Sequence, residues 1–213
     1  MEKKPRGRHM HLVCSDLEGI FVPEIWINVA DMTGIEELRL TTRDIPDYDV
    51  LMRHRLKIMT ENGLTLADVQ KAISRMDPLD GASKFLDWLR KKTQVIIVSD
   101  TYVEFAGPLM KKLHYPTLLC NSLSVDARGV IRNYLLRQDD GKRQVALAFK
   151  GLNYKVIAIG DSYNDITMLQ TADRGILYRP PENVRNENRH FPVCSSFAEL
   201  KNIISSIIKD QEG

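Results

Sequence analysis

Two clusters of carboxylates in this sequence each follow a short apolar run. The segment Asp16–Gly19 (Asp-Leu-Glu-Gly) follows Leu12–Cys14, and the segment Gly160–Asp165 (Gly-Asp-Ser-Tyr-Asn-Asp) follows Val156–Ile159. Such runs are typical of buried parallel strands, and sites in open α/β sheets form beyond the carboxyl ends of these strands. Because Mg²⁺ prefers oxygen ligands, the two clusters together predict one magnesium site. Either cluster alone could be an ordinary turn after a strand.

A hydroxyl and an ammonium group at two further positions could contact a phosphate. A run of four apolar residues is followed by Ser99–Thr101, where a hydroxyl and a backbone N–H could hold a phosphate oxygen. One of these three residues could instead cap a helix that begins near Tyr102. Lys142 opens a helical stretch, and a single lysine there could be no more than a solvated charge. Both positions gain a functional interpretation beside the carboxylate clusters, in which Asp16 and Asp161 are the obvious pair of metal ligands.

The order of these motifs resembles that of a known superfamily. Asp-x-Glu-Gly, an apolar run ending in Ser99, then Lys142, then Gly-Asp-Ser-x-Asn-Asp is similar to the motif series of the haloacid dehalogenase superfamily of aspartyl-phosphate phosphohydrolases. The resemblance spans nearly the whole chain. The segments Val22–Trp26 and Thr41–Asp49 look like those of its bifunctional phosphoserine phosphatase and phosphoserine:homoserine phosphotransferase members. In these members a glutamate, here Glu18, replaces the second aspartate of the more common Asp-x-Asp.

Composition agrees with an ordinary globular protein. The chain has 213 residues, of which 43% are hydrophobic and 27% charged, with a formal net charge of +2. This length suits one α/β core domain with a modest insertion. Residues 1–10 carry four basic side chains against one acidic one, so the rest of the chain is close to neutral. A basic stripe for nucleic acid is therefore not expected, and residues 1–10 are expected to be a disordered leader, with residues 1–9 possible additions before Met10.

The cysteines and the hydropathy pattern favour a cytoplasmic protein. The three cysteines are odd in number and show no Cys-x-x-Cys spacing; they are Cys14, Cys120 and Cys194. Reduced, buried thiols fit this pattern better than disulfides or zinc. No apolar segment of a secretory signal follows the basic head, and no apolar run approaches the length of a membrane span. We therefore expect neither a membrane partner nor a nucleic-acid partner.

Apolar periodicity predicts a Rossmann-like, doubly wound parallel sheet. The core is expected at 11–21 and 79–213. Its predicted strands are His11–Ser15, Gln94–Ser99, Thr117–Cys120, Lys155–Ile159, Arg174–Leu177 and Pro192–Cys194. Its predicted helices are Gly81–Lys92, Val103–Leu113, Lys142–Lys150, Asp165–Ala172 and Phe197–Lys209, the last with a capping box from Ser196 and Glu199. A β-hairpin is predicted at Leu123–Leu136.

The block 22–78 is helical in pattern and is inserted directly after the first strand. Its predicted helices are Glu24–Met32, Tyr48–Asn62 and Leu66–Met76, the third with a capping box from Thr65 and Asp68. An insertion at this point is expected to form a cap over the strand ends, where closure would exclude water. The alternative is a plain helical subdomain that does not contact the site.

Glu24 and Arg55 are the candidates for substrate selection within this block. An amino acid phosphate offers an ammonium and a carboxylate, whose natural partners are a carboxylate and a bidentate guanidinium. Both residues could otherwise be ordinary exposed helix charges. The resemblance favours the functional interpretation, because the superfamily places a glutamate shortly after its first motif and an arginine in its cap.

The resemblance also implies a mechanism and a reaction. Asp16 would attack phosphorus to form an aspartyl phosphate, and Glu18 would act as general acid and base. The metal would be Mg²⁺, and homoserine or water would accept the phosphoryl group, which implies roles in serine and threonine biosynthesis. The implied metal site comprises Asp16, the backbone carbonyl of Glu18, Asp161 and Asp165, the last orienting the metal shell. The implied phosphate or substrate contacts are Ser99, the amides near Asp100, Lys142 and Asn164.

Three alternatives stay open at this point. A plain phosphoserine phosphatase, or a phosphatase of another small phosphomonoester, would share every core residue. A signalling receiver also phosphorylates an aspartate at a strand end, but it has neither a helical cap nor the second carboxylate cluster. A binding protein descended from an enzyme is disfavoured because all the reactive residues are intact. The chain could be a monomer or a homodimer.

Overall fold

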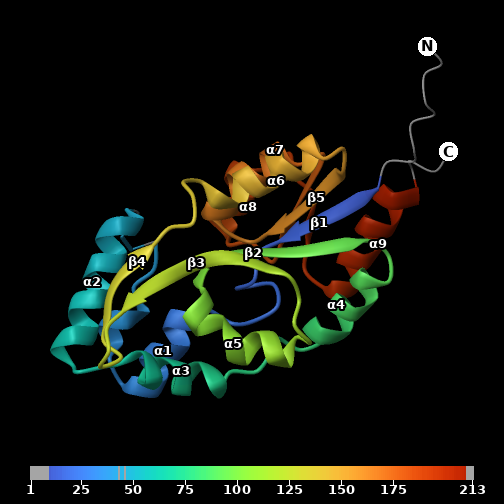
Figure 1. Ribbon diagram of the computed structural model, residues 1–213. Helices are drawn as coiled ribbons and strands as arrows, with labels where there is room; N and C mark the ends of the chain where they lie inside the picture. Colours follow the sequence, from blue (N-terminus) through green and yellow to red (C-terminus); the bar gives the residue numbers. More distant parts are fainter. Residues whose placement is uncertain (1–9, 43, 46, 210–213) are drawn as a thin grey trace, which may run out of the picture. The chain divides into compact units, whose positions relative to one another are not determined.

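The computed structural model describes residues 10–42, 44, 45 and 47–209 (Figure 1). Of the predicted leader 1–10, residues 1–9 lie outside the described residues. The chain forms two compact units, which are described separately. Unit 1 comprises 10–16, Phe85–Ile96 and 140–209, and unit 2 comprises Leu17–Lys84 and Ile97–Asp139.

Unit 1 is built on parallel strands. β1 (His11–Ser15) pairs with β5 (Lys155–Gly160), β5 pairs with β6 (Arg174–Tyr178), and β6 pairs with β7 (Val193–Cys194), all in parallel. Nearly every residue of β1 and β5 is buried, as expected for strands covered on both faces. The predicted parallel α/β pattern is confirmed in this unit, with strand ends within one residue of those predicted.

Helices cover both faces of these strands. α6 (Gly141–Gly151) and α7 (Ile166–Thr171) lie on one side of β1 and β5, and α9 (Phe197–Lys209) lies on the other (Figure 1). α9 packs beside α4 (Ala82–Arg90), and α8 (Glu182–Glu187) follows β6. Phe197 of α9 stacks on Phe85 of α4 at 4.8 Å and on Tyr178 of β6 at 5.1 Å between ring centroids. The doubly wound arrangement is thus present around these strands.

Unit 2 combines a strand pair with a hairpin. β2 (Gln94–Tyr102), which begins in unit 1, runs parallel to β3 (Leu118–Val125), and β3 runs antiparallel to β4 (Ile131–Leu135). α5 (Val103–Lys112) follows β2 directly. The predicted hairpin is confirmed, although β3 extends through both the predicted strand and the first arm of the hairpin.

The block after β1 is helical, as predicted. It contains α1 (Ile25–Thr33), the 3₁₀ helix η1 (Glu36–Arg39), α2 (Tyr48–Glu61) and α3 (Leu66–Ser74). α1, α2 and α3 begin within one residue of the predicted positions. Their apolar faces supply buried side chains to unit 2, and the function of this block as a cap stays a prediction.

Polar contacts tie this block to the rest of unit 2. The hairpin turn accepts a hydrogen bond from the start of α3, because the Leu66 N–H donates to the Gly129 carbonyl at 2.8 Å. The Tyr134 hydroxyl of β4 donates to the Asp49 carboxylate of α2. Near the end of the block, the Lys112 ammonium of α5 donates to the Met76 carbonyl at 2.6 Å. These bonds connect α2, α3 and the last residues of the block to the hairpin and to α5.

Two predicted capping boxes have different outcomes. At α3, the Thr65 hydroxyl accepts from Asp68 N and the Asp68 carboxylate accepts from Thr65 N at 2.8 Å, so this box is complete. At α9, Ser196 Oγ accepts from Glu199 N at 3.2 Å. The Glu199 carboxylate accepts from the N–H of Ser195 rather than from that of Ser196. The second capping box is therefore incomplete, because its carboxylate bonds the N–H one residue before the predicted one.

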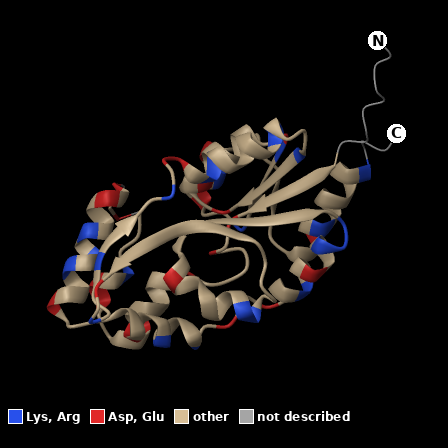
Figure 2. Cartoon of the chain, in the orientation of Figure 1, with Lys and Arg blue, Asp and Glu red and all other residues tan. Residues whose placement is uncertain are grey.

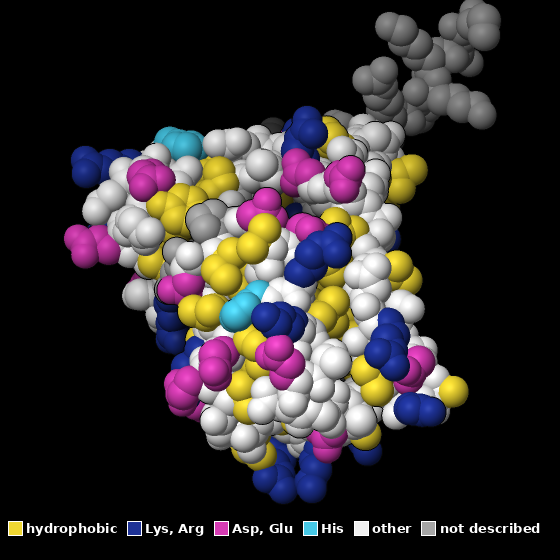
Figure 3. All heavy atoms as spheres, turned by 90° about the vertical axis from the view of Figure 1, so that its left-hand side faces the viewer, with side chains coloured by type: hydrophobic (Ala, Val, Ile, Leu, Met, Phe, Trp, Pro, Cys, Tyr) yellow, Lys and Arg dark blue, Asp and Glu magenta, His cyan; other side chains and the backbone are white. Residues whose placement is uncertain are grey.

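Charged residues of both signs are mixed on the described surface. Along α2, basic side chains lie between acidic ones near the two ends (Figure 2), with ion pairs of Arg53 with Asp49 at 2.6 Å and of Lys57 with Glu61 at 3.8 Å. The face that carries α2 and β4 shows the same mixture beside scattered apolar side chains (Figure 3). The three cysteines are buried and free. Among the described helices, none has the length and apolar character needed to cross a membrane.

Candidate active site

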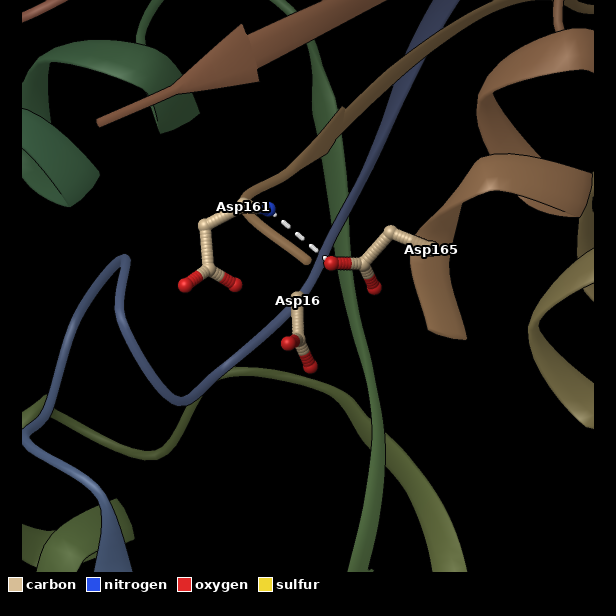
Figure 4. A group of neighbouring side chains, drawn as sticks. All are labelled: Asp16, Asp161 and Asp165. Atoms are coloured by element: carbon tan, nitrogen blue, oxygen red, sulfur yellow. Dashed lines mark hydrogen bonds between the residues drawn. The ribbon is translucent and has the colours of Figure 1, made fainter. Parts of the chain in front are cut away.

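Three carboxylates converge in unit 1 at the ends of β1 and β5. Asp16 directly follows β1, Asp161 follows β5, and Asp165 lies at the start of α7 (Figure 4). One ligand oxygen from each lies within 4.8 Å of those of the other two. Asp16 is 4% exposed and Asp165 is fully buried. The two predicted clusters, far apart in sequence, therefore meet because β1 and β5 are parallel neighbours.

Lys142 lies among these carboxylates. Its ammonium is 3.0 Å from Asp16 Oδ1 and 2.6 Å from Asp165 Oδ1, and its side chain is 3% exposed. The alternative of a solvated surface lysine is therefore wrong. Lys142 lies in the first turn of α6, where Asp140, the preceding N-cap, accepts a hydrogen bond from Thr167 of α7 at 2.7 Å. That bond ties the start of α6 to the helix that begins next to Asp165.

Asp165 is held by donors from its own loop as well as by Lys142. Its second oxygen, Oδ2, accepts from Asp161 N at 2.9 Å and from Ser162 N at 3.1 Å. The side chain lies against the backbone of Gly160, where an added Cβ would come within 2.6 Å of Asp165 Oδ2. Glycine is thus required at this position by close approach. Asn164, on the same turn, is exposed and accepts from the Ser162 hydroxyl.

The donor set and its charge suit a divalent metal ion. Three carboxylates against one ammonium leave a formal charge of −2 in a largely buried cluster. Buried charge of this kind is costly unless it is balanced, and hard oxygen donors favour Mg²⁺ over softer metals. The cluster therefore fits a magnesium ion chemically. The prediction for Glu18 concerned its backbone carbonyl and stays a prediction.

In unit 2, Glu18 lies in a tight turn. Leu17 O accepts hydrogen bonds from the N–H groups of Phe21 and Val22, and Gly19 has a φ of 72°, which favours glycine. The Glu18 carboxylate accepts from Ile25 N at 2.8 Å, at the first turn of α1. A helix N-terminus presents unpaired N–H groups and positive potential, so it holds an anionic side chain in place.

Residues 99–101, near the end of β2, depart from the regular pairing of β2 with β3. The alternative that Ser99, Asp100 or Thr101 caps α5 is wrong, because the N-cap is Tyr102 and no side chain caps it. Ser99 is 5% exposed, and its hydroxyl accepts from Thr101 N at 3.2 Å. The Asp100 carbonyl accepts from the side chains of Tyr48 and Asn121.

Arg55 is buried rather than an exposed helix charge. It is 5% exposed, and its guanidinium lies 4.6 Å from the ring centroid of Trp26. One nitrogen donates to the Leu40 carbonyl at 2.7 Å, while its buried Nε has no hydrogen-bond partner among the described residues. Burial lowers the pKa of Arg55, and the nearby Glu18 and Glu24 carboxylates oppose this shift. Arg55 and Glu24 thus belong to one electrostatic cluster in unit 2.

Sequence reasoning did not single out two hydroxyls beside this cluster. Tyr48 and Tyr102 place their hydroxyl oxygens 2.7 Å apart, and burial raises the pKa of both. Both residues also act electrostatically on Arg55. A tyrosine at each position carries no local signal, because the two residues meet only through the fold of unit 2.

Comparison with known proteins agrees with this geometry. The family model of the haloacid dehalogenase-like hydrolases matches residues 21–173. The chain belongs to this family. The hydrolase is 57% identical over 192 residues to a phosphoserine phosphatase of Pseudomonas syringae pv. tomato, covering 90% of this chain and 81% of that protein. It is 55% identical over 192 residues to phosphoserine phosphatase ThrH of Pseudomonas aeruginosa, with 90% and 94% covered.

Solved structures confirm the fold class of this hydrolase. A substrate-bound phosphoserine phosphatase complex matches with a TM-score of 0.73 at 18% identity, covering 94% of this chain and 99% of the other. A phospho-aspartyl intermediate analogue of phosphoserine phosphatase matches with a TM-score of 0.71 at 20% identity, covering 88% and 93%. The resemblance to the haloacid dehalogenase superfamily and the α/β fold predicted from it are both confirmed.

Proposed function

We propose that this hydrolase cleaves O-phospho-L-serine with Mg²⁺ and also transfers the phosphoryl group to L-homoserine. The observation that carries the proposal is the buried pairing of Asp16 with Lys142 beside two further aspartates. High identity to two phosphoserine phosphatases supports the choice of substrate. Its substrates would be small molecules, and the proposed reaction fits a cytoplasmic enzyme.

The first chemical step belongs to Asp16 and Glu18. A carboxylate oxygen of Asp16 bonds to phosphorus while the bond from phosphorus to the serine oxygen breaks. Glu18 donates a proton to the departing oxygen. In the second step Glu18 takes a proton from water or from the homoserine hydroxyl, whose oxygen bonds to phosphorus and releases Asp16.

The remaining residues hold charge and geometry. A magnesium ion at Asp16, Asp161 and the Glu18 carbonyl would supply positive charge to the phosphoryl oxygens. Lys142 holds Asp16 and balances part of the same charge. We assign Asp165 an orienting role, because both of its oxygens accept hydrogen bonds from the protein. The phosphate contacts would come from Ser99, the amides near Asp100, Lys142 and Asn164.

Arg55 and Glu24 would select an amino acid as the leaving group. The stacking of Arg55 on Trp26 and its bond to Leu40 O fix the guanidinium plane before any ligand binds. A fixed guanidinium suits bidentate recognition of a carboxylate. Glu24 is half-buried near Arg55 and would receive the ammonium group.

Comparing two substrates that differ by one group tests this assignment. Phosphate release would be measured with MgCl₂ on phosphoserine and on phosphoethanolamine, which lacks the carboxylate. The wild-type chain should prefer phosphoserine by roughly a hundredfold or more in kcat/KM, since the lost group leaves a buried guanidinium without a carboxylate partner. Arg55→Lys should reduce this preference, and Asp16→Asn should abolish both activities.

Equal rates on the two substrates would contradict the role of Arg55. Absence of turnover on phosphoserine, with turnover of another small phosphomonoester, would replace the substrate but keep the chemistry. A plain phosphoserine phosphatase is the second candidate. It would hydrolyse phosphoserine at a rate unaffected by homoserine.

A further inference from the structure

The segment Ser99–Thr101 bulges out of the strand pair in unit 2. β2 and β3 pair at Val98 and Leu119 and next at Tyr102 and Asn121. Three residues of β2 therefore face one residue of β3. A bulge of this kind removes regular ladder partners from the backbone, and bulges are over-represented next to active sites.

Side chains replace the missing ladder bonds at the Asp100 carbonyl. The Tyr48 hydroxyl donates to this oxygen at 3.3 Å, and Asn121 Nδ2 donates to it at 3.2 Å. Tyr48 is the first residue of α2, and Asn121 belongs to β3, so the donors come from two different elements. Asn121 is itself oriented, since its Oδ1 accepts from Arg137 N at 3.0 Å.

The other side of the same peptide contacts Ser99. A trans peptide places its N–H opposite its carbonyl, so fixing the Asp100 carbonyl also fixes the direction of the Thr101 N–H. That N–H donates to Ser99 Oγ at 3.2 Å. With its oxygen accepting this bond, the Ser99 hydroxyl hydrogen is directed away from Thr101. The orientation of the hydroxyl thus depends on the orientation of one peptide.

The hydrogen-bond directions at the two tyrosines are mutually consistent. If Tyr48 donates to Asp100 O, its oxygen is left to accept from the Tyr102 hydroxyl, 2.7 Å away. Tyr102 is 1% exposed, so its hydroxyl needs this partner. Tyr48 also lies within electrostatic range of Arg55. One hydroxyl therefore interacts both with the proposed carboxylate-binding residue and with the proposed phosphate-binding loop, both in unit 2.

We propose that Tyr48 is a positioning residue that holds the Asp100 peptide so that Ser99 and the adjacent amides are set to bind phosphate. This inference rests on the proposed function only in taking Ser99 and these amides as phosphate contacts. It assigns to α2 a second task besides carrying Arg55. Through Tyr48, the helix that carries Arg55 also orients the phosphate-binding loop.

Binding of inorganic phosphate to the intact chain, measured by calorimetry in buffer with MgCl₂, tests the proposal without requiring turnover. Tyr48→Phe keeps the ring and removes only the hydroxyl. We expect the Kd for phosphate to rise about fivefold, the usual effect of one hydrogen bond, since Asn121 still holds the peptide. The melting temperature of the same samples shows whether the variant is folded.

Two further variants separate positioning from stability. Tyr134→Phe also removes a hydroxyl that contacts α2, but that hydroxyl bonds Asp49 and not Asp100. Its phosphate affinity should stay within about twofold of the wild-type value. Tyr48→Phe leaves the buried Tyr102 hydroxyl without its partner. The double variant Tyr48→Phe, Tyr102→Phe removes that hydroxyl too. Its melting temperature should therefore rise relative to Tyr48→Phe, while its phosphate affinity should stay low.

A lower melting temperature of Tyr48→Phe with unchanged phosphate affinity would overturn the inference, since Tyr48 would then be only structural. Equal weakening by Tyr134→Phe, or no phosphate binding by the wild-type chain, would overturn it as well. A wild-type chain that binds phosphate but leaves phosphoserine intact would instead refute the proposed function while the role of Tyr48 stood.

Discussion

Lys142 lies where a helix normally disfavours a positive charge. The first turn of a helix carries partial positive charge, which makes an ammonium there unfavourable. In α6 this cost is offset by the carboxylates of Asp16 and Asp165, at 3.0 and 2.6 Å from the ammonium. A lysine in the first turn of a helix goes against the usual charge preference, and such exceptions are expected at functional sites.

Replacing Lys142 by methionine should strongly destabilise the chain when metal is absent. The variant leaves Asp16 and Asp165 buried without their cation, and breaking a buried pair costs roughly 3–5 kcal/mol. Urea unfolding in EDTA measures this loss. Lys155→Met is the matched control, because Lys155 pairs with Asp173 at 3.3 Å but is 35% exposed, and it should cost at most about 1 kcal/mol. Similar losses in the two variants would contradict the buried pairing.

Gly160→Ala should lower both kcat and the free energy of unfolding. The new Cβ would collide with Asp165, and overpacking of this kind costs roughly 1–3 kcal/mol. Displacement of Asp165 should lower kcat by about a hundredfold, since small misplacements in a site have large effects. Activity assays on the folded variant measure this.

The control for Gly160→Ala is a second glycine of unit 1. An added Cβ at Gly175 would meet Leu169 O at 2.7 Å, the Phe191 ring at 2.8 Å and Leu169 Cβ at 2.9 Å, and none of these three nearest atoms belongs to a carboxylate. Gly175→Ala should therefore lose comparable stability but keep the kcat of its folded fraction. Equal kcat values in the two variants would disprove the placement of Asp165 against Gly160.

The residues that the sequence predicted best are those with a local signal. Asp16 and Asp161 follow strands whose apolar pattern is clear, so their convergence followed from strand topology. Lys142 carried no such signal, and only its place in the motif series connected it with them. Tyr48 and Tyr102 were not predicted, because their hydroxyls meet across 54 positions of sequence. No pattern local to either tyrosine encodes such a contact.

Among the elements, the long helices with a regular apolar pattern were predicted well. α2 and α9 begin at the expected residues, whereas α8, with six residues and one buried side chain, was missed. β2 runs three residues beyond its predicted end, because the strand continues through the bulge at Ser99–Thr101 and pairs with β3 again at Tyr102. A bulge depends on the register with β3, which the sequence of β2 alone does not contain.

The start of α3 offers a test at this scale. Thr65→Ala removes one half of the complete capping box, which should cost roughly 1 kcal/mol of unfolding free energy. Thr60→Ala is the control, because the Thr60 hydroxyl donates to Leu56 O inside α2 and caps nothing. That change should stay within about 0.5 kcal/mol. Denaturant unfolding measures both losses, and equal losses in the two variants would contradict the role of Thr65 as a helix cap.

At the scale of the whole molecule, the charge of the carboxylate cluster predicts stabilisation by metal. An ion that binds only the folded chain raises its stability by about 2.7 kcal/mol at a concentration of 100 times Kd, or roughly 5–10 °C in melting temperature. MgCl₂ should produce this shift relative to KCl of equal ionic strength. Asp161→Asn should lose most of it. Identical melting in both salts would contradict the metal site.

The most direct test of the whole account is one product analysis. The wild-type chain is given phosphoserine and MgCl₂, with and without homoserine, and inorganic phosphate and phosphohomoserine are quantified together, beside Asp16→Asn. We predict that phosphohomoserine forms at the expense of inorganic phosphate and that Asp16→Asn forms neither. Phosphate release unchanged by homoserine would contradict the transfer, and products formed by Asp16→Asn at the wild-type rate would contradict the phosphorylated aspartate.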